Sequence, residues 1–281
     1  MSLKLVTDSN AQLPDAFALC YEVLVVPIVI LLDGAERREG NDIDADEFYE
    51  LLPTIKDVTT SQPSPGEFVE VYQRAVSQGA TEIVSVHLGS ELSGTLNSAR
   101  LAAQQVDVPV HLVDTGLTSF SVSCAVFEAA SARSAGGDAA ACVQAALAVC
   151  PDVHNVFVMG GLDLARGSGR VTIDDEIERI SAEGVPVFAL DDGALEVLGN
   201  ADDLAGAALI MRDVIAATSG PVRVGVGVAD RALFGFYDKL EALLDEADNV
   251  VDVIRYRCGP SVGAFTGAGT AGACWYQIPS A

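Results

Sequence analysis

Serine and threonine hydroxyl groups recur in four short loops, which we expect at the carboxyl ends of strands. The loops are Thr7-Asp8-Ser9, Thr59-Thr60-Ser61-Gln62, Ser90 through Thr95, and Asp114-Thr115. Hydroxyl groups are neutral donors, and two of the loops immediately precede predicted helices, whose first backbone N–H groups favour an anion. Such a set binds an anion without a strong base. Ordinary helix capping explains the same residue types, so the pattern alone leaves both interpretations open.

A nucleophilic interpretation of the same loops gives the alternative function. Ser93 as nucleophile, His87 as base and Asp114 as its partner would make a serine-dependent hydrolase acting on a small acyl substrate. No sequence motif orients these three residues. We therefore expect binding, and we expect His87 to be a core or rim histidine.

Two matches to catalytic signatures near the end of the chain lack their context. GPSVG at 259–263 fits a nucleophile elbow, but that elbow needs a later histidine, and the last histidine is His154. GAGTAG at 267–272 fits a dinucleotide loop, but too few residues follow it to build the helix and strand of that unit. Neither match carries a function.

The elements that position the loops are short β-branched runs alternating with amphipathic segments, which is typical of α/β proteins. The first half predicts strands at 3–7, within 23–32, at 82–88 and at 108–114, and helices at 44–53, 64–78, 93–105, 121–135 and 138–149. Asp44 and Ser64 are expected N-caps with a glutamate three residues later, and Asp33-Gly34 is an expected turn. Because parallel strands end at one edge, this half predicts a Rossmann-like parallel sheet with the polar loops gathered there.

The second half predicts a different sheet. We expect strands at 155–160, 222–228, 249–257 and from 273, a hairpin over 185–199 turning at Asp192-Gly193, helices at 174–183, 203–217 and 234–246, and Gly-rich turns at 164–171 and 259–272. A hairpin pairs its strands antiparallel. The sequence therefore predicts two α/β domains, residues 1–153 with the parallel sheet and residues 154–281 with a mixed or antiparallel sheet.

Composition excludes several function classes. Forty acidic residues against sixteen basic ones give a net charge of −24, which repels nucleic acid and anionic membrane surfaces. The longest apolar run, 23–32, is half the length of a membrane helix, and no signal peptide is evident at the start. Six irregularly spaced cysteines predict reduced, mostly buried thiols and no metal site. We expect a cytoplasmic protein.

Segments along nearly the whole chain resemble, in order, the DegV family. They are KLVTDSNAQLP (4–14), VPIVILLDG (26–34), EGNDIDADEFYELL (39–52), TTSQPSPGEFVEVY (59–72), VSVHLGSELSGTLNSA (84–99), VHLVDT (110–115), GSGRV (167–171), LDDGALEVLG (190–199) and GPSVGAFTGAG (259–269). The resemblance implies two α/β domains that hold one long-chain fatty acid in a tunnel between them. It also implies a carrier that needs no cofactor, is not itself an enzyme, and presents the acid to a fatty-acid kinase for phospholipid synthesis.

The resemblance also implies roles for particular residues. Ser93 matches the serine that hydrogen-bonds the carboxylate, Gly94 and Thr95 share its block, and either Thr60 or Ser61 supplies a second hydroxyl. The candidate residues at the pocket mouth are Arg170, Phe265, Asp8, Ser9 and Ser119.

One position departs from the family pattern. Family members usually carry a histidine in the late Gly-rich loop, in a G-T-H-T-G context, and Phe265 stands there in GAFTG. We therefore expect coupling to a family kinase to be slow or absent.

Overall fold

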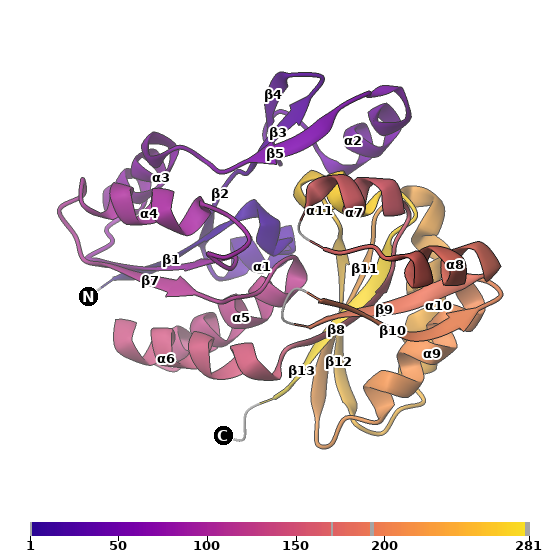
Figure 1. Ribbon diagram of the computed structural model, residues 1–281. Helices are drawn as coiled ribbons and strands as arrows, with labels where there is room; N and C mark the ends of the chain where they lie inside the picture. Colours follow the sequence, from indigo (N-terminus) through magenta and orange to yellow (C-terminus); the bar gives the residue numbers. More distant parts are fainter. Residues whose placement is uncertain (1, 170, 192–193, 279–281) are drawn as a thin grey trace. The chain divides into compact units, whose positions relative to one another are not determined.

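The computed structural model describes residues 2–169, 171–191 and 194–278. These residues form two compact units (Figure 1). Unit 1 comprises the chain up to Ile43 together with Thr60–Pro151, and unit 2 comprises Asp44–Thr59 together with the chain from Asp152 onward. The sequence-based division at 153/154 assigned residues 44–59 to the first domain, whereas they pack with unit 2.

The parallel sheet predicted for the first half is confirmed. Within the described residues of unit 1, four strands pair in the order β2-β1-β6-β7, all parallel. Their bounds are β1 (Leu3–Asp8), β2 (Val23–Val26), β6 (Glu82–His87) and β7 (Val110–Asp114). The register places Thr7 beside Val86 and His87 beside Asp114, so these strands end at one edge.

Helices cover both faces of this sheet (Figure 1). They are α1 (Asp15–Cys20), α3 (Pro65–Ser77), α4 (Thr95–Ala103), α5 (Phe120–Ser134) and α6 (Ala139–Val149). Helices α3 and α4 pack with Val6 and Ile83 in one apolar core. Helices α5 and α6 lie on the opposite face, where Phe17 of α1 contacts Phe127 of α5 at a ring distance of 4.2 Å. Of these five helices, α1 was not predicted from the sequence, since it is short and buries no residue fully.

The strand order creates a switch point between β1 and β6. From β1 the chain runs through α1 to β2 on one side, and from β6 it runs through α4 to β7 on the other side. The two connecting helices lie on opposite faces, so the loops after β1 and β6 diverge. Ligands bind open α/β sheets at this place, outside the carboxyl ends of the strands.

The apolar run 23–32 forms two strands rather than one. Proline has no N–H to donate to a sheet, and Pro27-Ile28 interrupts the strand between β2 and β3 (Val29–Leu32). The turn at Asp33-Gly34 is confirmed: φ is +48° and +82°, as a tight hairpin requires. It leads to β4 (Ala35–Arg38), and the described strands β4-β3-β5, with β5 at Val58–Ser61, form a small second sheet.

Unit 2 contains a mixed sheet, as predicted. Its described strands pair in the order β10-β9-β8-β13-β11-β12, and of these only β11 and β12 are parallel. Their bounds are β8 (His154–Val158), β9 (Val185–Asp191), β10 (Ala194–Ala201), β11 (Val222–Val228), β12 (Val250–Arg257) and β13 (Ala271–Gln277). The hairpin β9-β10 is confirmed, while its expected turn at 192–193 lies outside the described residues.

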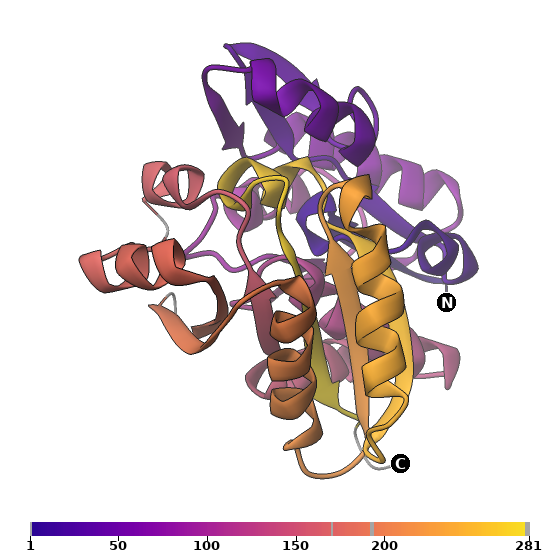
Figure 2. The same ribbon diagram turned by 90° about the vertical axis from the view of Figure 1, so that its right-hand side faces the viewer.

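The helices of unit 2 include two that pack on this sheet. They are α2 (Ala45–Leu51), α7 (Leu162–Ser168), α8 (Asp175–Glu183), α9 (Leu204–Ala216), α10 (Phe234–Leu244) and α11 (Pro260–Thr266). Figure 2 shows α9 and α10 side by side against the sheet, where their apolar faces meet β8, β11 and β13 in one core. Short 3-10 turns lie at Ser9–Ala11, Leu52–Thr54, Cys150–Asp152 and Arg231–Leu233.

Helices α7 and α11 correct the sequence analysis, which predicted Gly-rich turns at both places. Helix α7 ends at Ser168, and Gly169, whose φ is +65°, forms its left-handed C-cap. Helix α11 begins with a proline at its first position, and its Gly263 lies so close to α2 that a Cβ there would be 2.3 Å from the hydroxyl of Tyr49. Here glycine permits close helix packing, which composition does not distinguish from a loop.

Candidate ligand site at the carboxyl edge of the parallel sheet

Ser93 lies in the loop that joins β6 to α4. Its hydroxyl lies 2.9 Å from the hydroxyl of Thr95 and accepts the Thr95 backbone N–H at 3.3 Å. Ser93 is half-buried, Thr95 is buried, and Gly94 between them is the N-cap of α4 without a side-chain cap. The Ser93 hydroxyl therefore stands at the first turn of a helix, where the backbone N–H groups favour an anion.

Two of the four hydroxyl-rich segments of the sequence analysis lie together, and the first of them is not a loop as expected, because Thr59, Thr60 and Ser61 belong to strand β5. The side-chain amide of Gln62 packs directly on Gly94, since a Cβ at position 94 would be 1.9 Å from Gln62 Oε1. Gln62 follows Thr60 and Ser61, so the structure brings this segment to the start of α4. Thr60 is half-buried and Ser61 is exposed, because successive residues of β5 face opposite sides. Sequence reasoning did not single out Gln62.

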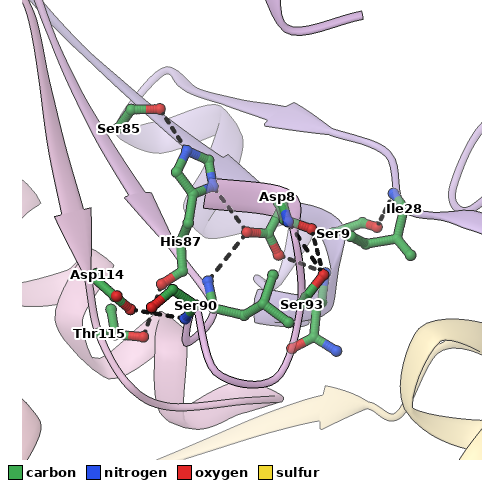
Figure 3. Close-up of polar contacts among 12 residues, drawn as sticks. Asp8, Ser9, Ile28, Ser85, His87, Ser90, Ser93, Asp114 and Thr115 are labelled. Carbon is green, nitrogen blue, oxygen red and sulfur yellow. Dashed lines mark hydrogen bonds and ion pairs between the residues drawn. The ribbon is translucent and has the colours of Figure 1, made fainter. Parts of the chain in front are cut away.

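Ser9, a candidate mouth residue, has its hydroxyl engaged. Ser9 Oγ accepts the N–H of Ile28 at 2.9 Å and donates to the carboxylate of Glu39 (Figure 3 shows the Ser9–Ile28 contact). Glu39 is buried and also accepts from Gln12 Nε2 at 3.5 Å. Ser9 therefore holds the loop after β1 against the start of β3. No sequence signal marked Glu39, because an isolated glutamate between strands is ordinarily exposed.

In the structure the imidazole of His87 contacts Asp8 and Ser85, and not the Asp114 and Ser93 of the hydrolase alternative. His87 Nδ1 lies 2.8 Å from Asp8 Oδ2, and His87 Nε2 lies 2.6 Å from Ser85 Oγ (Figure 3). These three side chains have no exposed surface. Asp114 instead accepts the backbone N–H of Ser90 at 3.1 Å. The expectation of a core histidine is confirmed for His87, and the hydrolase interpretation gains no support.

Ser119, the N-cap residue of α5, has a strained backbone conformation. Its φ of +59° and ψ of −152° fall in a region that residues other than glycine rarely adopt. The side chain of Asn10 holds it there, because Asn10 Oδ1 accepts the Ser119 N–H at 2.9 Å and the Thr118 hydroxyl at 3.0 Å. Ser119 thus links the loop after β7 to the loop after β1.

Two further candidates come from the second half of the chain. Arg170 lies outside the described residues. Phe265 is a half-buried residue of α11 in unit 2.

Metal and membrane chemistry gain no support from the described part of the chain. It contains no group of three His, Cys, Asp or Glu side chains arranged to hold a metal ion. Its helices are all too short or too polar to cross a membrane. The six cysteines are free thiols and four of them are buried, which confirms the expectation of mostly buried thiols. Burial raises the pKa of the Cys258 thiol to about 12, which disfavours the thiolate form.

Parallel strands, diverging loops and a polar edge define an α/β protein of the kind that holds a ligand at the switch point of its sheet. Comparison with known proteins then fixes the family. The family model described as "Uncharacterised protein, DegV family" matches residues 2–277. The chain belongs to the DegV family, as its sequence resemblance indicated.

Individual relatives agree with this assignment. A DegV domain-containing protein of Streptomyces coelicolor is 30% identical over 269 residues, covering 95% of this chain and 96% of the relative. The structure is similar to that of a fatty-acid-binding DegV family protein from Thermus thermophilus, with a TM-score of 0.85 and 28% identity. The match covers 99% of this chain and 100% of that one. A DegV lipid binding protein from Thermotoga maritima, at 23% identity and full coverage of both chains, shares the fold with a TM-score of 0.84.

Proposed function

We propose that this protein is a cytoplasmic carrier that binds one long-chain fatty acid and is not itself an enzyme. The carboxylate is held by the hydroxyl of Ser93, with Gly94 and Thr95 in the same turn and Thr60 or Ser61 as the second donor. The acyl chain occupies a tunnel between the two α/β domains, and a fatty-acid kinase is the partner.

The observation that carries the proposal is the likeness to the fatty-acid-binding protein from Thermus thermophilus over nearly the full length of both chains. The local chemistry supports it. A half-buried hydroxyl at the first turn of α4, with the Gln62 amide packed beside it, supplies donors for a carboxylate. Thr60 is favoured over Ser61 as the second donor, because Thr60 is the half-buried residue of the two.

Burial of the acyl chain contributes most of the binding free energy, so the contacts to the carboxylate need not be strong. Burying one methylene contributes about 0.8 kcal/mol, so an acyl chain of about fifteen methylenes contributes roughly 12 kcal/mol before entropic losses. The head group then needs only enough donors to avoid an unsatisfied buried carboxylate. Hydroxyl groups at a helix start supply them without a nucleophile or a base.

The test is the ligand itself. Protein purified from its expression host, denatured and extracted, should release about one equivalent of a long-chain fatty acid, measured by mass spectrometry, since a ligand held with a Kd below about 1 μM, or more than about 8 kcal/mol, survives chromatography. A folded and homogeneous preparation that contains no acyl species and takes up no added fatty acid would refute the proposal.

The kinase step can be tested at Phe265. A histidine donates a hydrogen bond at a phosphoryl-transfer site, and a phenyl ring does not. We expect native protein to support little acyl-phosphate formation with a family kinase, and Phe265→His to raise it. Fatty-acid affinity should change by only about 1 kcal/mol, the scale of one net hydrogen bond. Full phosphorylation with native protein would show that the histidine is dispensable.

A further inference from the structure

A row of four polar side chains is buried on the side of the parallel sheet that faces α3. It runs from Tyr72 through Ser85 and His87 to Asp8, with successive contacts of 2.9, 2.6 and 2.8 Å. All four side chains have an exposed fraction of 0%, and Phe68 packs edge-on against the imidazole ring. Groups this deeply buried are costly unless their donors and acceptors are used.

The hydrogen bonds of this row can all be donated in one direction, from Tyr72 toward Asp8. Burial raises the pKa of the Tyr72 phenol, so the phenol keeps its proton and donates to Ser85. Donation in the order Tyr72, Ser85, Nε2 of His87 places the proton of a neutral ring on Nδ1. Nδ1 then faces Oδ2 of Asp8 at 2.8 Å. In this order every donor of the row meets an acceptor.

Asp8 is also the junction of two loops. Its Oδ2 accepts the backbone N–H of Leu88 at 3.2 Å, and its Oδ1 accepts the backbone N–H of Asn10 at 3.2 Å. Leu88 begins the loop that carries Ser93, and Asn10 lies in the loop after β1. One carboxylate thus fixes two loops that leave the sheet on either side of its switch point (Figure 3).

The loop after β7 is hydrogen-bonded to the backbone of His87, the imidazole partner of Asp8. The backbone carbonyl of His87 accepts the Thr115 hydroxyl at 2.8 Å and the Thr115 N–H at 3.2 Å. The N–H of Gly89 donates to the carbonyl of Leu117 at 2.8 Å, and the N–H of Ser93 donates to the carbonyl of Gly89 at 3.2 Å. Ser93 is therefore held in a set of loops whose centre is the Asp8–His87 pair.

We propose that Asp8 and His87 form a positioning pair that sets the place of the Ser93 hydroxyl, so that recognition of an ionised head group depends on two side chains that do not touch the ligand. This inference rests on the proposed function. A carboxylate needs its donors within a narrow range of distance and angle. A fatty alcohol carries no charge and depends on them less. Loss of the pair should therefore weaken acid binding selectively.

Two substitutions at His87 test the pair. His87→Leu introduces an apolar side chain of similar bulk and leaves Asp8 without its imidazole partner. His87→Asn places an amide N–H near the position of Nδ1 and restores a partner. We expect His87→Leu to weaken binding of a fluorescent fatty acid by about 10- to 100-fold, and binding of the matching fatty alcohol by less than about 3-fold. His87→Asn should recover most of the acid affinity.

Tyr72→Phe is the matched control. It removes a hydroxyl from the far end of the same row, at equal burial, without touching Asp8. It should lower the Tm and leave the ratio of acid to alcohol affinity within about 2-fold of the native ratio. A purely structural role for the row would instead give all three variants the same ratio.

A measurement on the native protein decides the question if a variant fails to fold. The chain has three histidines, so ¹⁵N-histidine NMR resolves the signals of His87. These signals are assigned as the ones that disappear in His87→Asn. If that variant does not fold, they are assigned as the ones that remain after substitution of His111 and His154. We expect the ring proton on Nδ1, in a downfield signal that shifts when the fatty acid is added and shifts less with the alcohol.

The outcomes separate the two proposals. If native protein prefers the acid but His87→Leu changes both affinities equally or neither, or if the native proton lies on Nε2, the positioning pair is wrong and fatty-acid binding stands. If native protein binds neither probe, the proposed function fails and the positioning pair fails with it.

Discussion

At the scale of single residues, the site depends on how each hydroxyl is engaged. Ser9 and Ser93 are both loop serines beside strand ends, and residue type alone does not distinguish them. The hydroxyl of Ser9 is hydrogen-bonded to Ile28 and Glu39, which lie in other segments of the chain. The hydroxyl of Ser93 contacts only Thr95, in the first turn of its own helix, among the hydrogen bonds of the described residues. Ser93 is therefore the serine whose hydroxyl can turn to an incoming carboxylate.

Ser93→Ala should weaken fatty-acid binding without unfolding the protein. Loss of the hydroxyl leaves a buried carboxylate one donor short, which costs roughly 1–3 kcal/mol, and the alcohol of equal length should lose less. Displacement of a fluorescent acyl probe measures both affinities. Ser90→Ala is the control, because Ser90 is an exposed serine of the same loop whose backbone N–H makes its contact with Asp114. Equal losses for acid and alcohol would show that Ser93 does not meet the head group.

Gly94→Ala should reveal the contact between the two hydroxyl-rich segments. The new Cβ would overlap Gln62 Oε1, and the flexible end of Gln62 must move away. We expect the free energy of unfolding, measured with urea, to fall by about 1 kcal/mol. On a Gln62→Ala background the same substitution should cost less, since the obstacle is gone. An unchanged cost on that background would mean that the strain at position 94 has another source.

At the scale of elements, helix starts follow their sequence signals closely. Asp44, Asp138, Asp174 and Asp203 cap helices α2, α6, α8 and α9 with their side chains. The start of α3 adds a complete capping box: the Glu67 carboxylate accepts from the N–H and hydroxyl of Ser64 at 2.8 and 2.9 Å. Arg38 joins it at 2.7 Å, tying α3 to β4.

The capping box predicts a pH-dependent contribution to stability. Burial alone would raise the pKa of Glu67, but the hydrogen bonds from Ser64 and the Arg38 guanidinium together hold it below its ordinary value of 4.5. Its contribution to stability is therefore complete above pH 4.5 and is lost as the pH falls through the lower folded-state pKa. Ser64→Ala should cost about 1 kcal/mol at pH 7 and less in acid, measured by urea unfolding at both pH values. A cost that does not shrink in acid would contradict this account.

At the scale of the whole molecule, the net charge of −24 opposes the approach of an anionic ligand. The Debye length falls from about 30 Å at 0.01 M salt to about 8 Å at 0.15 M, so salt screens this repulsion. We expect the association rate of a fatty acid, measured by stopped-flow fluorescence, to rise with salt over this range. The rate of the matching alcohol serves as the control and should stay nearly constant. An acid rate that falls with salt would mean that a local positive field outweighs the net charge.

The sequence by itself determined the elements, the two kinds of sheet and the loops that carry hydroxyl groups. Periodicity, capping residues and turn residues act over a few positions, so they are visible in the printed chain. The DegV resemblance added the family, which the match over residues 2–277 bears out. Where packing decides between a helix and a turn, as at α7 and α11, local signals gave the wrong element.

Only the tertiary structure decided which side chains meet. His87 is 79 residues from Asp8, Ser9 is 30 residues from Glu39, and Gln62 reaches Gly94 from another loop. The sequence analysis paired His87 with Ser93 and Asp114 in its alternative, because all three stand near strand ends. Strand order and the alternation of side chains across the sheet instead place His87 on the face of Asp8 and Ser85. Such contacts depend on how distant segments pack, and nothing in the spacing of residues along the chain specifies them.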